Sequence, residues 1–96
     1  MKRIEQTKKL LGNLIKKTRA TTMDQEELAL RSGTSTNTIS RLERGKGVNT
    51  DTLLSVLNQL DLLDPILTVI EEQYELVDKN PLRKTSKQAL ELPNDF

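Results

Sequence analysis

The sequence predicts an all-α fold of five helices followed by a C-terminal tail. Apolar residues recur at intervals of three and four, capping residues and glycines separate the periodic segments, and no segment shows clear strand alternation between turn signals. The 96 residues, 34% of them hydrophobic and 2% aromatic, allow one small core. Because so short a chain gains little stability alone, a dimer is expected.

The first helix is expected to begin between Arg3 and Thr7 and to be amphipathic. Its inward residues recur at helical spacing: Leu11, Leu14, Ile15 and Thr18. Its lysines fall on the outer side. The helix should end at the turn formed by residues 20–23, before the next capping residue.

The next two helices are bounded by recognisable caps. Asp24 with Glu27 three residues later is typical of a capping box, and Gly33 suits the left-handed backbone of a C-terminal cap. Ser35 is the expected N-cap of the third helix, which Gly45 ends. The inward residues of the two helices are Leu28, Ala29, Ile39 and Leu42.

The fourth helix is expected over about residues 50–60, with Asn49 as its cap. We expect it to bury four leucines: Leu53, Leu54, Leu57 and Leu60. Asp64 and Pro65 predict the start of a fifth helix, because a carboxylate caps free N–H groups and proline lacks the N–H that would need one. Residues 75–78 could instead pair briefly as an edge strand. The chain then divides into a domain of residues 1–78 and a flexible tail of residues 79–96, which is polar and poorly periodic beyond Asn80.

The residue types that are missing exclude several function classes. The chain has no Cys and no His, which removes disulfides, thiol nucleophiles, imidazole bases and nearly all transition-metal sites. We therefore expect no metal and no cofactor. Since no apolar run approaches the roughly 18 residues that a membrane helix needs, and no signal-type stretch follows the N-terminus, we expect no membrane contact and a cytoplasmic location.

Charge is unevenly distributed along the chain. Residues 1–20 carry seven Lys or Arg against the single Glu5, whereas residues 61–78 carry six acids and no cation. A protein that meets nucleic acid with one face and keeps its other end away from the phosphates would have this distribution. The alternative is two ordinary solvated helix faces.

The segment 25–44 has the spacing of a helix-turn-helix. Counting Gln25 as position one, the small residue is fifth, the glycine ninth and the branched residues fifteenth and eighteenth: Ala29, Gly33, Ile39 and Leu42. Two helices that cross closely need a small residue at the contact, a glycine in the turn and branched residues to fill the angle. The third helix is otherwise polar, and such a face in a small core indicates a binding role.

The run from residue 10 to about residue 70 resembles the Cro/cI-type (XRE) family of phage-repressor-like regulators. The matching residues are Leu11, Gly12, Ile15, Arg19, residues 24–29, Gly33, residues 37–45, Leu53, Leu54 and residues 57–60. The resemblance implies a lambda-repressor-like DNA-binding domain that acts as a homodimer on a pseudo-palindromic operator with half-sites about one helical turn apart. One departure is the turn at residues 20–23, which is one residue shorter than usual and leaves the register of the first helix in question.

The resemblance also implies roles for individual residues. Residues expected at base edges in the major groove are Thr36, Asn37, Ser40 and Arg41. Residues expected at phosphates are Gln25, Ser35, Arg44 and Lys46, with Lys16 and Lys17 as weaker candidates. Gln25 is also expected to brace the recognition helix, and Arg19 and Glu43 to form a partly buried ion pair. The alternative for the third helix is a solvated polar face.

Partner contacts are expected from the last helix and the tail. Dimerisation would use an apolar stripe that could otherwise pack on the fourth helix: Leu63, Ile66, Leu67, Ile70 and Tyr74. The tail, ending in Asn94, Asp95 and Phe96, resembles that of HipB-like antitoxins, which implies an autoregulator that binds a HipA-type serine/threonine kinase toxin, with Phe96 as a tail anchor. The alternative is a phage, plasmid or restriction-control regulator without a toxin partner.

Two other functional classes, an enzyme and a protein-interaction module, are alternatives to a DNA-binding repressor. An enzyme would have to rely on carboxylates such as Glu71, Glu72 and Glu75, with no histidine, cysteine or phosphate loop to assist them. A protein-interaction module that has lost DNA binding would not need Gln25 and Arg41. The sequence therefore favours a DNA-binding repressor over both.

Overall fold

The computed structural model describes residues 1–79 and confirms the all-α class with five helices. Their bounds are α1 Lys2–Ala20, α2 Gln25–Ser32, α3 Thr36–Glu43, α4 Thr50–Gln59 and α5 Leu63–Asp78. The expected flexible tail lies outside the described residues, except for Lys79. The chain divides into two units, Met1–Asp64 and the part from Pro65 onward.

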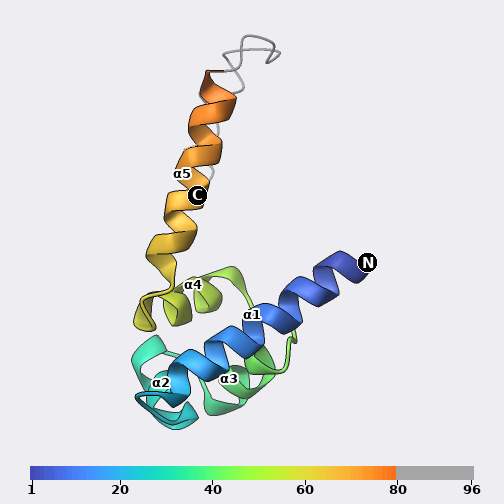
Figure 1. Cartoon of the computed structure of the whole chain (residues 1–96). Helices are drawn as coiled ribbons and strands as arrows, with labels where there is room; N and C mark the ends of the chain where they lie inside the picture. The colour runs from blue at the N-terminus through green and yellow to red at the C-terminus, as the bar shows by residue number, and fades with distance from the viewer. Residues whose placement is uncertain (80–96) are drawn as a thin grey trace. The chain divides into compact units, whose positions relative to one another are not determined.

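In the first unit α2 packs against both α3 and α4, and α1 packs against α3 (Figure 1). The fully buried side chains at the centre come from α1, α2, α3 and α4: Ile15, Leu28, Ile39 and Val56. Ala29, Leu42, Leu57 and Leu60 complete the core. The four residues predicted to face inward on α2 and α3 are all buried.

The helix caps confirm most of the predicted boundaries. Asp24, Ser35 and Asn49 each accept a hydrogen bond from the backbone N–H three residues later, at 2.9, 3.1 and 2.8 Å. Gly33 has φ of 70°, in the left-handed region that favours glycine. The carboxylate of Glu27, however, accepts a hydrogen bond from Arg31 at 2.7 Å, so only the Asp24 half of the expected capping box is seen.

The face of α4 differs from the prediction. Val56 is fully buried, whereas Leu54 is 41% exposed and Leu53 is half-buried. Residues 53, 56, 57 and 60 lie at i, i+3, i+4 and i+7, so this set shares one side of the helix, and Leu54 points away from it. The prediction is correct for Leu57 and Leu60 and wrong for Leu54, because it considered only the leucines and left out Val56.

The two terminal helices begin earlier than expected. The first starts at Lys2 rather than between Arg3 and Thr7, and Leu14 on its predicted inner side is 48% exposed. The last starts at Leu63, so Asp64 lies in its first turn instead of capping it. Residues 75–78 are helical, and the predicted edge strand is wrong.

No single described helix is long and apolar enough to cross a membrane. Only α4 and α5 taken together, as a bent pair, reach the length and composition that a span requires.

Candidate nucleic-acid interface

The turn between α2 and α3 has the geometry of a helix-turn-helix. Ala29 is 3% exposed at the contact between the helices, and the backbone N–H of Thr34 donates to its carbonyl oxygen at 2.9 Å. The N–H of Gly33 donates to the carbonyl of Leu30 at 3.3 Å. These bonds close the end of α2, and α3 begins at Thr36 after three intervening residues, the last of which is its cap Ser35.

The helix α3 is anchored on one side and open on the other. Ile39 and Leu42 are buried in the core. Three of the four residues predicted to read bases, Thr36, Asn37 and Arg41, are exposed, and Ser40 is half-buried. The structure thus brings the four onto one outward face.

The residues at the carboxyl end of α3 shape the neighbouring loop. Arg41 donates from Nη2 to the carbonyl oxygen of Gly47 at 3.2 Å, which links the guanidinium to the loop that joins α3 to α4. Arg44 donates from Nε to the carbonyl of Ser40 at 3.2 Å. Arg44 and Lys46 are both exposed, as phosphate contacts would have to be.

Ser35 caps the amino end of α3. Its hydroxyl accepts from the N–H of Thr38 at 3.1 Å and lies 2.8 Å from the Thr38 hydroxyl. The side chain is exposed, and its expected contact with a phosphate remains a prediction.

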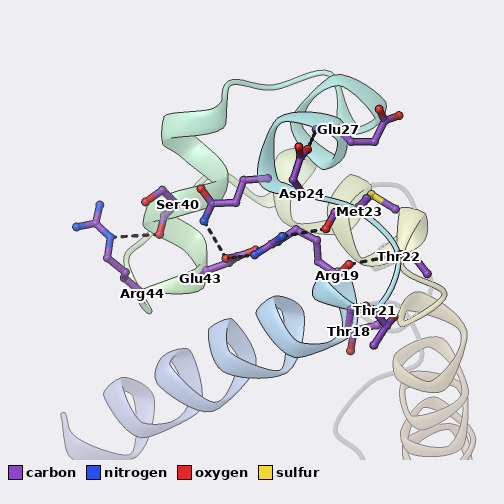
Figure 2. A network of polar contacts seen from close by, with 11 residues as sticks. Thr18, Arg19, Thr21, Thr22, Met23, Asp24, Glu27, Ser40, Glu43 and Arg44 are labelled. Carbon is purple, nitrogen blue, oxygen red and sulfur yellow. Dashed lines mark hydrogen bonds and ion pairs between the residues drawn. The ribbon is translucent and has the colours of Figure 1, made fainter.

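A buried ion pair fixes α3 to α1, as the sequence predicted. Arg19 donates from Nε and Nη2 to the two carboxylate oxygens of Glu43, at 2.6 and 3.2 Å, and from Nη1 to the carbonyl of Met23 at 3.0 Å (Figure 2). The side chains are 11% and 3% exposed. Because a guanidinium and a carboxylate match in two parallel bonds, the pair holds α3 in one orientation. The pair also fixes the register of α1 relative to α3, which the short turn at residues 20–23 had left in question.

Gln25 joins the same network. Its Nε2 donates to Oε1 of Glu43 at 3.0 Å, so the first residue of α2 braces the last residue of α3. The side chain is half-buried, with part of its surface still open to solvent. The bracing role expected for Gln25 is present, while its expected phosphate contact is not tested.

The Arg19–Glu43 pair was predicted, but the glycines that let α1 approach the end of α3 closely were not. A Cβ on Gly12 would lie 2.5 Å from the carbonyl oxygen of Leu42, and one on Gly45 would lie 3.2 Å from Cα of Lys9. For Gly12 a signal was present, because a glycine inside a helix costs about 1 kcal/mol relative to alanine and often marks a close approach of backbones. Gly45 lies outside the helices and has φ of 80°, which by itself favours glycine.

The predicted dimer stripe lies on α5, where no residue is buried. Leu63 and Ile66 are half-buried. Leu67, Ile70 and Tyr74 are 45%, 55% and 50% exposed. Phe96, the predicted tail anchor, lies outside the described residues.

Comparison with known proteins gives one match. A family model described as helix-turn-helix matches residues 15–65, which include the whole of α2, α3 and α4 and the loop that carries Lys46. Neither a curated protein nor a solved structure matches the chain.

Proposed function

Because the chain belongs to the helix-turn-helix family of DNA-binding transcription regulators, we propose that it is a sequence-specific repressor that reads its operator through α3. The observation that carries this proposal is the exposed polar face of α3, on a helix anchored by the buried pair of Arg19 and Glu43. A recognition helix must hold its side chains in a fixed geometry, and a buried ion pair with two parallel bonds provides one.

The base-reading residues differ in what they can recognise. Arg41 can donate both arms of its guanidinium to O6 and N7 of guanine, and Asn37 can pair with N6 and N7 of adenine. Thr36 and Ser40 offer hydroxyls that suit either. Each good bidentate pair contributes about 1 to 3 kcal/mol of discrimination. In this proposal Arg41 releases its bond to the carbonyl of Gly47 when it meets a base.

The phosphate contacts would come from the residues around this face. Arg44 and Lys46 are exposed at the carboxyl end of α3, while Gln25 and Ser35 are at the amino ends of α2 and α3. Contacts of this kind set the register of a protein on the duplex without reading sequence. Gln25 would then have two roles, since the amide that donates to Glu43 would also lie beside the duplex.

We propose that the repressor acts as a homodimer whose protomers meet through α5. The support is the apolar stripe on that helix, of which the single chain leaves Leu67, Ile70 and Tyr74 exposed, since neighbouring exposed apolar side chains often mark a protein contact. Two copies would place two α3 helices on half-sites about one helical turn apart.

The proposed biological role is that of an autoregulatory antitoxin in the bacterial cytoplasm, which binds a HipA-type kinase through its tail. Its support is the sequence resemblance of the tail that ends in Phe96. A regulator without a toxin partner is the alternative, and neither version requires an enzymatic activity of this chain. If the adjacent gene encodes such a kinase, the kinase should co-purify with the full chain and be lost with Phe96→Ala.

The test of the repressor is a gel shift on the DNA immediately upstream of its own gene. The wild type should retard this fragment in the presence of excess unrelated duplex, and Arg41→Ala should abolish that preference. Arg31→Ala is the matched control, because Arg31 is an exposed arginine of α2 paired only with Glu27 on the surface. Equal retardation by Arg41→Ala and wild type would exclude α3 as the reader of this site.

A further inference from the structure

Three lysines of α1 share one face of the helix. Lys2, Lys9 and Lys16 are spaced seven residues apart, a spacing that drifts by only about 20° per repeat around an α-helix. They therefore form a line about 21 Å long, at about 1.5 Å per residue. All three side chains are exposed, and within residues 1–79 none of them has an ion-pair partner.

This line of lysines runs beside the end of the recognition helix. Gly45 packs on α1 at the middle lysine, where a Cβ would lie 3.2 Å from Cα of Lys9. Arg44 and Lys46, the neighbours of Gly45 in the chain, are both exposed. The three lysines thus continue a basic edge that begins at the loop after α3.

The amino-terminal half of α1 is not needed for the core. All of its buried residues, Gly12, Ile15 and Arg19, lie in its carboxyl-terminal half. Figure 1 shows the first turns of α1 continuing beyond α3. The only acid of α1, Glu5, lies three residues after Lys2 and four before Lys9, and so on the same face as the row. Its carboxylate pairs with Lys8 at 3.7 Å, so the face keeps an excess of positive charge.

Helix stability does not account for these lysines. The helix dipole favours cations in the last turn of a helix, which in α1 holds Lys17 and Arg19 and none of the three lysines. A cation in the first turn is disfavoured by the same dipole, so Lys2 opposes the stability of α1. A row of unpaired cations beside the proposed recognition helix, present even where the dipole opposes it, indicates a polyanionic ligand.

We propose that Lys2, Lys9 and Lys16 form a phosphate-binding edge that extends the DNA contact from the end of α3 along α1. The inference rests on the proposed function and adds to it a set of contacts outside the helix-turn-helix. It also distinguishes Lys16 from Lys17, the two weaker candidates for phosphate contact in the sequence analysis. Lys16 belongs to this edge and Lys17 does not.

The test compares two triple variants of the full chain in binding to a fluorescein-labelled 20-base-pair duplex of mixed sequence. Non-specific binding of this kind comes from phosphate contacts, so no operator is needed. One variant carries Lys2→Gln, Lys9→Gln and Lys16→Gln. The matched control carries Arg3→Gln, Lys8→Gln and Lys17→Gln, which removes the same charge from other faces of the same helix. Circular dichroism and thermal melting verify that both variants fold.

The readout is the slope of log K against log of the KCl concentration between 50 and 200 mM. This slope is negative, and each lost phosphate contact reduces its magnitude by about 0.9. The edge variant should therefore reduce the magnitude by about 2 to 3 and the control by less than about 1. Equal slopes for both variants would overturn the proposal, because a general loss of charge would then explain the effect. An unchanged slope for the edge variant would also overturn it. If the wild type itself bound the duplex without salt dependence, the proposed DNA-binding function would fail as well, which distinguishes the two failures.

Discussion

Gly12 lies against the carboxyl end of α3 so closely that a Cβ on it would be 2.5 Å from the carbonyl oxygen of Leu42 and 2.9 Å from that of Glu43. Both obstacles are backbone atoms, which cannot move aside as a flexible side chain can. Gly12→Ala should therefore separate α1 from α3, although alanine is the better helix former. We expect a loss of about 1 to 3 kcal/mol in the free energy of unfolding, measured by urea denaturation.

Gly47→Ala is the control for this substitution. A Cβ on Gly47 would have no neighbour within 4 Å. Its unfolding free energy should match that of the wild type within about 0.5 kcal/mol. Equal losses for the two variants would show that the contact of Gly12 with Leu42 is not tight in solution.

Removal of Arg19 should be more damaging than removal of both members of its ion pair. In Arg19→Met the carboxylate of Glu43 stays buried without its guanidinium, for which we expect a loss of about 3 to 5 kcal/mol. The double variant Arg19→Met, Glu43→Met leaves no buried charge and should recover part of that loss. A double-mutant cycle from urea unfolding measures the recovery, and strictly additive losses would contradict a buried pair.

Gln25→Glu should destabilise the protein more than Gln25→Ala. The amide now donates to Glu43 at 3.0 Å, and a glutamate would place a second carboxylate in the same position. We expect Gln25→Ala to cost about 1 kcal/mol for the lost hydrogen bond, and Gln25→Glu to cost more because like charges repel. Thermal melts at equal protein concentration compare the two, and a glutamate variant as stable as wild type would mean that Gln25 does not brace α3.

Ile70→Asp should dissociate the proposed homodimer. Ile70 is at the centre of the apolar stripe of α5, and an unpaired carboxylate buried there by a second copy would lose its hydration. Sedimentation equilibrium should show a dissociation constant at least about tenfold higher than that of wild type, equivalent to about 1.4 kcal/mol.

The control is Thr68→Asp, which adds the same charge to the same helix on the side that carries its acids. It should leave the dimer intact. A wild type that sediments as a monomer, or a dimer equally weakened by both variants, would exclude α5 as the interface.

The features that could be predicted from the sequence are those set by short-range chemistry. Asp24, Ser35 and Asn49 cap helices because each side chain needs only a backbone N–H three residues away. The glycine turn at Gly33 and the inward faces of α2 and α3 follow from spacing in the same way. The pair of Arg19 and Glu43 is a long-range contact, and only the resemblance to a known family made it predictable.

Only the tertiary structure decided the features that depend on a distant neighbour. Periodicity shows that α4 has an apolar side, but the position of α2 decides that Val56 is buried and Leu54 is not. The approach of α3 to α1 gives Gly12 its role and places Lys9 beside the loop at Gly45. Capping and periodicity involve residues within one or two helical turns of each other, so the local sequence is enough to predict them. Burial and the closeness of cations depend on which helices meet, and packing of the whole first unit determines that.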